Sequence, residues 1–134
     1  MTRKDARELL MQAVFQMDIQ DDHSNELLEL FLSDKNVDKK NGDFIRSTFE
    51  SIRRNILHID DTIDKYATNW NVKRMPKTDL AILRVAIGEM FYSDEIADAI
   101  AINEAVEMAK KYCGEESSKF INGVLGSVSR SQDA

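Results

Sequence analysis

The stretch LAILRVAIGEMFY, residues 80–92, decides the fold of this chain. Only Arg84 and Glu89 are charged within it, so a helix formed by these residues would be apolar on nearly every side. Pro76 lies just ahead and suits the first turn of a helix, where a missing N–H is no loss. A helix without a polar face has to be covered by other elements, so we expect this one to be central and buried.

Amphipathic segments flank the central helix on both sides, because apolar residues recur there at three- and four-residue spacing. The six further helices predicted in this way run from Thr2 to about Ile19, from Ser24 to about Leu32, from Asp43 to about Ile56, from Asp60 to about Trp70, through Ile102 as far as Gly114, and from Ser117 to about Val128. Residues 33–42 are predicted to form a loop and residues 129–134 to fray. Gly123 and Gly126 lower the helix propensity of the last segment, which indicates close packing there.

The fold class follows from these patterns. No segment alternates apolar with polar residues for long enough to predict a strand, and the chain holds one proline and five glycines. The sequence therefore predicts an all-α fold of seven helices, arranged as two small bundles that share one core. We expect a single domain over residues 1–134, with one bundle at about 1–58 and the other at about 60–130.

Composition excludes several classes of protein. No run of ~18 apolar residues could span a membrane, and the N-terminus lacks the apolar core of a signal peptide, so a cytoplasmic protein is expected. The single Cys113 can form no internal disulfide, and His23 and His58 lie far from it along the chain. Neither a metal site nor a cofactor is predicted. Phosphate-binding loops and nucleophile motifs are also missing, so the chain is not expected to be an enzyme.

One acidic motif has both a functional and a structural interpretation. Asp60, Asp61 and Asp64 match the DDxxD pattern that holds magnesium-diphosphate in isoprenoid synthases. Such enzymes carry a second acidic motif and a deep pocket, which this chain is too short to build. Acidic residues at a helix start are also favoured by the helix dipole alone. We therefore predict that Asp60 is an N-cap and that the motif binds no metal.

The charge distribution restricts where a nucleic acid could bind. The chain has 18 basic and 24 acidic residues, a formal net charge of −6, which argues against a generic nucleic-acid binder. The negative charge is concentrated in residues 21–105, whereas residues 1–20 and 106–134 are each neutral. An RNA contact is therefore expected on a small surface near the two ends of the chain, with a more basic partner sharing the strand.

Both ends carry residues that suit such a contact. Arg3, Lys4 and Arg7 begin the first predicted helix, where they could reach phosphates or form an ordinary solvated turn. Near the other end, Lys110, Lys111 and Lys119 accompany the aromatic residues Tyr112 and Phe120, a combination that single-stranded RNA needs for phosphate contacts and for stacking. Phe120 also falls on the apolar stripe of the last helix and could belong to the core.

Three segments in a fixed order carry a family resemblance. They are DLAILRVA at residues 79–86 followed by Glu89, AINEAVEMAK at residues 101–110, and KFINGVL at residues 119–125. These segments closely resemble the signature stretches of NusB proteins. The opening Arg3, Ala6, Arg7, Glu8 and the later QAVFQ at residues 12–16 are similar to the start of the same family. The resemblance spans nearly the whole chain and is weakest over residues 20–60.

The resemblance implies a seven-helix NusB fold and a role in transcription antitermination. Proteins of this family bind the boxA element of nascent RNA as a heterodimer with the ribosomal protein NusE, and the complex helps RNA polymerase to read through terminators in ribosomal RNA operons. Family RNA contacts lie at the N-terminus and at the turn joining the last two helices, with an acidic position nearby. Carried over to this chain, the implied RNA-binding residues are Arg3, Lys4, Arg7, Asp79, Tyr112, Lys119 and Phe120. Many relatives have more arginines at the N-terminus than this chain does.

Two other interpretations keep the fold and change the function. A domain of this shape also resembles the N-terminal part of certain ribosomal RNA cytosine methyltransferases, although this chain stops before any catalytic domain. The acidic middle of the chain could instead make it a protein-interaction module that binds a basic ribosomal protein without touching RNA. The resemblance leaves open whether the chain is a monomer or a homodimer whose interface covers the RNA surface.

Overall fold

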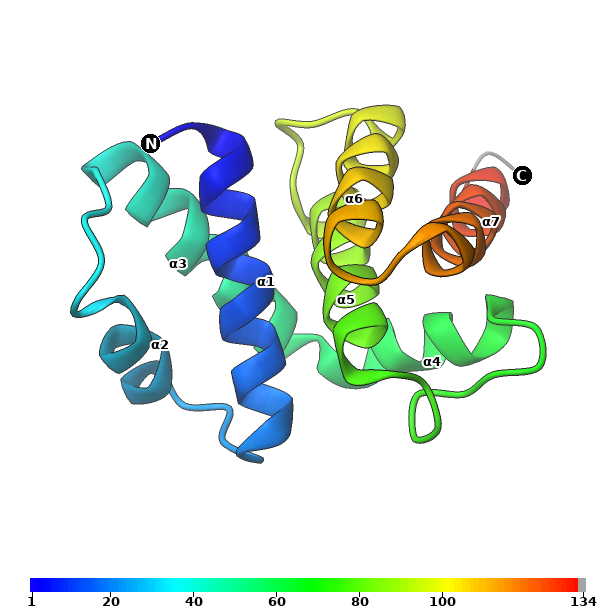
Figure 1. The fold of residues 1–134 in the computed structure, drawn as a ribbon, viewed down its shortest axis with the longest axis horizontal. Coiled ribbons are helices and arrows are strands. Elements are labelled where there is room, and N and C mark those ends of the chain that lie inside the picture. Colours follow the sequence, from blue (N-terminus) through cyan, green and yellow to red (C-terminus); the bar gives the residue numbers. More distant parts are fainter. Residues whose placement is uncertain (133–134) are drawn as a thin grey trace.

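The protein is a bundle of seven α-helices in the computed structural model, which describes residues 1–132 (Figure 1). The helices are α1 (Arg3–Ile19), α2 (Asn25–Leu32), α3 (Lys39–Arg54), α4 (Ile56–Tyr66), α5 (Lys77–Tyr92), α6 (Asp98–Tyr112) and α7 (Glu115–Gln132). The described residues contain no strand. The predicted all-α fold with seven helices is confirmed. None of the helices between residues 1 and 132 is long and apolar enough to cross a membrane.

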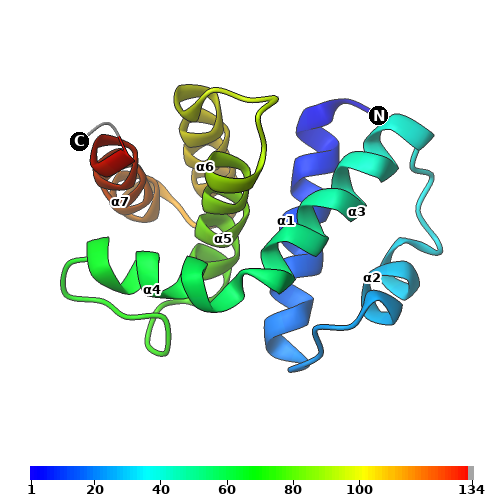
Figure 2. The ribbon, with the colours of Figure 1, turned by 180° about the vertical axis from the view of Figure 1, so that it is seen from behind.

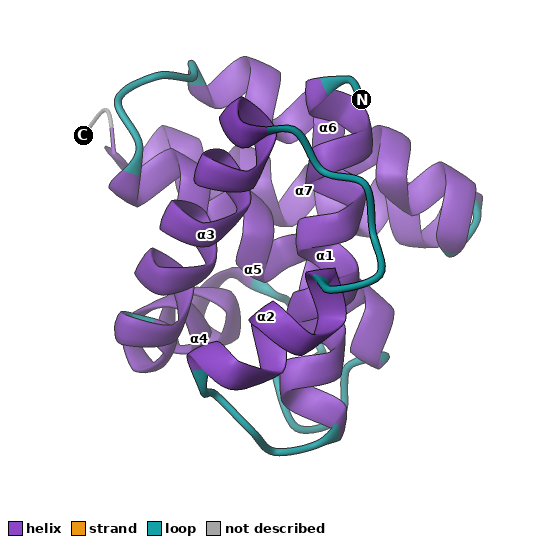
Figure 3. Cartoon of the chain, turned by 90° about the vertical axis from the view of Figure 1, so that its left-hand side faces the viewer, coloured by secondary structure: helices purple, strands orange, loops and turns teal. Residues whose placement is uncertain are grey.

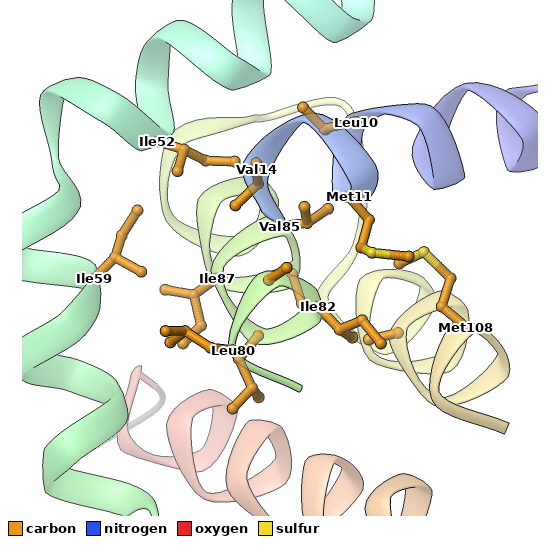
Figure 4. Packing of buried hydrophobic residues seen from close by; sticks show 14 of the residues in the cluster. Leu10, Met11, Val14, Ile52, Ile59, Leu80, Ile82, Val85, Ile87 and Met108 are labelled. Carbon is orange, nitrogen blue, oxygen red and sulfur yellow. The ribbon is translucent and has the colours of Figure 1, made fainter. Parts of the chain in front are cut away.

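Helix α5 is the centre of the core, as its composition predicted. Every residue from Asp79 to Glu89 is buried, and α5 packs against α1, α3, α4, α6 and α7. Figure 4 shows side chains from four of these neighbours gathered around Ile82, Val85 and Ile87 of α5. Seen from either side, α1, α2 and α3 form one group and α4, α6 and α7 the other, with α5 between them (Figures 1 and 2). We interpret these groups as the two expected bundles of a single domain.

Arg84 and Glu89 of α5 are buried and paired. Arg7 Nε of α1 lies 2.7 Å from Glu89 Oε1, and both side chains are almost fully buried. Arg84 lies 3.2 Å from Asp18 Oδ1 of α1 and 2.8 Å from Asp60 Oδ2 of α4. A buried charge is tolerated only with a well-placed partner, so these pairs fix how α1 and α4 lie against α5.

Several predicted helix limits are confirmed by their caps. Thr2 and Asp5 form a capping box at the start of α1, which ends at Ile19 as expected. Ser24 Oγ accepts a hydrogen bond from Leu27 N at 3.3 Å and starts α2. The central helix begins directly after Pro76.

Two of the predicted starts in the middle of the chain are wrong. Helix α3 begins at Lys39 rather than at Asp43, because the carboxylate of Asp38 accepts a hydrogen bond from Asn41 N at 3.2 Å and caps the helix earlier. Figure 3 shows the loop that joins α2 to α3. The loop before it is correspondingly shorter than predicted. Asp60 is not an N-cap: it lies inside α4, which starts at Ile56, and its carboxylate holds Arg84.

The C-terminal helix also differs from expectation. Gly114 has a φ of +104°, which favours glycine, and α7 begins one residue later rather than after Ser117. Gly123 faces open space, since no heavy atom lies within 4 Å of an added Cβ, so close packing there is wrong. The helix continues to Gln132, so residues 129–132 do not fray as expected, and residues 133–134 lie outside the described range.

Candidate nucleic-acid interface

The end of α6 meets the start of α1 through three polar side chains. Glu8 Oε1 accepts hydrogen bonds from Lys111 Nζ at 2.7 Å and from Tyr112 Oη at 2.6 Å. Lys111 and Tyr112 are exposed, and Glu8 lies beneath them. We call Glu8, Lys111 and Tyr112 the junction cluster. It joins the first helix to the end of α6, but through Glu8 and not through the predicted Arg3 or Arg7.

The electrostatics of the junction cluster are those of a charged hydrogen-bond network. Burial raises the pKa of the Glu8 carboxyl, but the hydrogen bonds from Lys111 and Tyr112 outweigh it and leave that pKa below its ordinary value. The hydrogen bond to Glu8 raises the pKa of Lys111, and it also raises the pKa of Tyr112, with burial adding to the latter. At neutral pH the cluster therefore holds a carboxylate, an ammonium and a neutral phenol.

Lys4 lies on the same side of α1 as the junction cluster. Lys4, Glu8 and Gln12 follow one another at four-residue steps, which places them in one row along the helix. Gln12 Nε2 lies 3.5 Å from Tyr112 Oη, and Lys4 is exposed. Lys4 is one of the predicted site residues, whereas Glu8 and Gln12 are not, although their four-residue spacing from Lys4 in the sequence places them on the same side of the helix.

Arg3 and Arg7 lie on another side of α1. The guanidinium of Arg3 stacks over the ring of Phe44 at 4.1 Å, and its Nε donates to Asn41 Oδ1 at 3.0 Å. Arg7 is only 7% exposed and is held by Glu89. The expectation that Arg7 clamps a phosphate does not fit this burial, because its guanidinium already faces a buried carboxylate. Arg3 keeps part of its surface open beside α3.

Asp79 is buried beneath the turn between α6 and α7. Ser117 Oγ donates to Asp79 Oδ2 at 3.1 Å, and burial, with a smaller contribution from Asp79, raises the pKa of the Cys113 thiol to about 12. Asp79 therefore holds the turn from below and does not face solvent. The prediction that Asp79 binds RNA does not fit this burial, because its carboxylate instead holds the turn that follows Tyr112.

Lys119 and Phe120 are neighbours on α7 but lie in different surroundings. Lys119 is exposed and lines a groove of about 560 Å³ between α6 and α7, together with Lys110, Asn103 and Asn122. Phe120 is half-buried and packs against the hydrophobic core. Lys119 thus extends the cationic surface beyond Lys111, whereas Phe120 offers only part of its ring. Tyr112, with 40% of its surface exposed, is the more open aromatic residue at this turn.

Two further features complete the surroundings of the junction cluster. Tyr112 borders a groove of about 300 Å³ that is also lined by Met11 and Phe15 of α1, Phe31 of α2 and Thr78 of α5. Within residues 1–132, no three His, Cys, Asp or Glu side chains lie close enough together to hold a metal ion. The surface therefore has cations, one open ring and an adjoining groove, which are the parts of a binding surface.

Comparison with known proteins identifies one family. The model of the NusB family matches residues 4–130 of this chain. The transcription antitermination protein NusB of Acetivibrio thermocellus is 42% identical over 128 residues, covering 96% of this chain and 88% of that protein. The NusB of Natranaerobius thermophilus is 39% identical over 131 residues, covering 96% and 94%.

Solved structures agree with these relatives. Thermotoga maritima NusB superimposes with a TM-score of 0.89 at 33% identity, covering 97% of this chain and 92% of that one. The structure of antitermination factors NusB and NusE in complex with double-stranded RNA contains a chain that superimposes with a TM-score of 0.88 at 24% identity, covering 96% of each. The second likeness supports the fold alone.

Proposed function

Because the chain belongs to the NusB family, we propose that it acts in transcription antitermination, by binding boxA RNA of ribosomal RNA transcripts together with the ribosomal protein NusE. Its matched relatives are transcription antitermination proteins, and a structural neighbour of the same fold was solved with NusE and RNA. The pair would then join the RNA polymerase antitermination complex in the cytoplasm. No catalytic step is part of this proposal.

The observation that carries the proposal is the junction cluster with its neighbouring cations. Lys4, Lys111 and Lys119 are exposed on α1, α6 and α7, and the exposed ring of Tyr112 ends α6, with Lys111 Nζ 5.3 Å from its centroid. Their ammonium groups can contact successive phosphates, while the ring of Tyr112 stacks on an unpaired base. The Glu8 carboxylate occupies Lys111 and Tyr112 in the free protein, and an RNA phosphate would take its place. Arg3 extends the cationic surface toward α3, and Arg7 positions α1 from within.

The net negative charge of the chain is the reason why we expect it to need a partner for binding RNA. With a net charge of −6, the protein can attract RNA only through local cationic surfaces such as this one. A basic ribosomal protein can both bind the acidic remainder and extend the cationic path of the strand. We therefore propose that NusE supplies a large share of the RNA affinity, which is also consistent with the few arginines in α1.

An electrophoretic shift assay tests this proposal. We expect boxA RNA to shift weakly with this protein alone and strongly when NusE is added, whereas a scrambled RNA of equal length should stay unshifted at the same concentrations. A complex with NusE that leaves boxA affinity unchanged would indicate the protein-interaction module instead. Addition of a methyl donor to the same reaction, with methylated RNA as the readout, tests the methyltransferase alternative.

A further inference from the structure

The loop between α4 and α5 is the most cationic segment of the chain. From residue 65 to residue 77 there are four basic residues and no acidic one, in a protein of net negative charge. They are Lys65, Lys73, Arg74 and Lys77. Lys77 is paired with Asp18 at 2.8 Å, but within residues 1–132 no carboxylate lies within 4.0 Å of Lys73 or Arg74. These two exposed cations are available for an anionic partner.

Trp70 stands open on the same loop. It is the only tryptophan in the chain, and 46% of its surface is exposed. Among the described residues, no aromatic ring and no cation stacks on its indole. An exposed indole without a stacking partner leaves its face open to stack on an unpaired base.

The loop is held in shape by its own hydrogen bonds. Val72 N donates to Asp64 Oδ1 at 2.7 Å, which ties the loop to α4, and Arg74 N donates to Asn71 Oδ1 at 3.1 Å. Met75 is buried and anchors the far end. The indole and the two cations are therefore presented by a preformed loop, so binding need not order it first.

The loop enters α5 at the end that carries the proposed RNA surface. Thr78, in the first turn of α5, lines the same groove as Tyr112, and Asp79 holds the turn that follows Tyr112 through Ser117. Figure 1 shows the loop leading directly into this end of α5. A strand that leaves Tyr112 along the groove therefore passes toward the loop.

We infer that the α4–α5 loop is a second contact for single-stranded RNA, with Trp70 stacking on a base while Lys73 and Arg74 hold the flanking phosphates. The inference rests on the proposed function and extends the bound strand beyond the Tyr112 surface. Exposed aromatic rings beside cations are the usual means of holding single strands. A basic protein partner is disfavoured here, because the unpaired positive charges would repel it.

The single tryptophan makes the inference directly testable. Fluorescence of Trp70 is followed while a short RNA limited to boxA and a long RNA that continues beyond it are titrated into the protein–NusE complex. The Trp70→Phe protein in the same complex supplies the background. We expect the long RNA to quench the Trp70 signal and the short RNA, centred on boxA, to bind without quenching it.

Charge variants give the matched comparison. The double variant Lys73→Gln/Arg74→Gln removes two exposed cations, and we expect it to bind the long RNA roughly tenfold more weakly, with the salt slope lowered by about 1.4, while the short RNA is unaffected. Arg46→Gln/Arg54→Gln removes the same charge from exposed positions on α3, and its affinity for the long RNA should stay close to that of the wild type.

The outcomes separate this inference from the proposed function. Long RNA that shifts the complex without quenching Trp70, and with equal affinity in the Lys73/Arg74 variant, would overturn the inference and leave the proposed function intact. Quenching by NusE in the absence of RNA would assign the loop to a protein contact and overturn it as well. If neither RNA binds under any condition, the proposed function and the inference fail together.

Discussion

Arg7 and Glu8 are neighbours in the sequence, yet they belong to two different regions of the molecule. Arg7 points into the core and pairs with Glu89 at 2.7 Å, with both side chains almost fully buried. Glu8 points to the other side of α1 and pairs with Lys111, whose side chain is 59% exposed. The buried pair has no alternative partner, whereas the groups of the junction cluster can exchange theirs for solvent or for a ligand. A charged residue on a helix can therefore be assigned to the core or to a binding surface only when the side of the helix that carries it is known.

The largest expected difference between the two regions is in stability. Arg7→Ala leaves Glu89 buried without its partner, and we expect the free energy of unfolding to fall by about 3–5 kcal/mol. Lys111→Ala removes a cation from the junction cluster and should change stability far less, because solvent can replace the lost hydrogen bond. Urea denaturation of the two variants, followed by circular dichroism, measures the contrast.

A double variant distinguishes a pairing effect from a packing effect. Arg7→Met/Glu89→Leu removes both buried charges, and we expect it to recover most of the stability lost in Arg7→Ala, since apolar replacements of a buried pair are often neutral or better. If the double variant were less stable than Arg7→Ala, the pair would have to be part of a larger polar network than the contacts of Arg7 and Glu89 indicate.

The sequence could predict this fold because its strongest signals were local. The segment 80–92 is apolar on all sides, and Thr2 and Ser24 cap their helices within three residues, so neither depends on distant contacts. The pairing of Arg7 with Glu89 joins residues 82 positions apart, and no local pattern contains it. The same applies to Asp60, which looked like an N-cap because its partner Arg84 lies on another helix.

The candidate site was predictable only in outline. Counting charge showed that the two ends of the chain were the least acidic parts, and Tyr112 and Lys119 do lie at an exposed turn. Summing the charge over residues 21–105 hid the cationic loop, because the acidic residues of that range outnumber its basic ones. The sequence could not show how exposed each side chain is. Trp70 lies on the apolar pattern of the predicted fourth helix and would be assigned to the core, whereas in the structure its side chain is exposed.

The surface around the junction cluster should control RNA affinity, and we expect the largest loss of affinity for substitutions of Tyr112. Tyr112→Leu removes the ring, and we expect boxA binding to the complex with NusE to weaken by about 1–3 kcal/mol, the value of one stacked base. Tyr112→Phe keeps the ring and loses only the hydrogen bond to Glu8, so it should bind nearly as well as the wild type. Equal losses in both variants, measured by fluorescence anisotropy of labelled RNA, would refute stacking on this ring.

Lys119 tests the cationic part of the same region. Lys119→Gln should weaken binding to boxA and to unrelated single strands by similar factors, because a phosphate contact carries no sequence information. It should lower the salt slope by about 0.7, the value for one phosphate contact with a single strand. Lys39→Gln, an exposed lysine on α3 and away from both proposed RNA contacts, is a control of equal charge. A salt slope equal to that of the wild type would remove Lys119 from the path of the strand.

The acidic residues beside this region should act in the opposite direction. Glu116 is exposed in the first turn of α7, near Lys119, where its charge repels phosphate. We expect Glu116→Gln to tighten boxA binding by a few-fold at low salt, with the gain shrinking as salt screens the charge. Unchanged affinity at low salt would place the strand away from the start of α7.

Glu8 gives the smallest effect and the closest test of partner exchange. Glu8→Gln frees Lys111 and Tyr112, so RNA binding should tighten by about two- to five-fold while stability at neutral pH falls slightly. Burial raises the pKa of Glu8, but the hydrogen bonds from Lys111 and Tyr112 outweigh it and leave the pKa below its ordinary 4.5. The carboxylate therefore stabilises the fold above about pH 4.5, and this contribution is lost as the pH falls through the lowered pKa. The free energies of unfolding of the wild type and of Glu8→Gln should therefore become equal in acid. A difference that persisted in acid would mean that Lys111 and Tyr112 are held against α1 by something other than the charge of the Glu8 carboxylate.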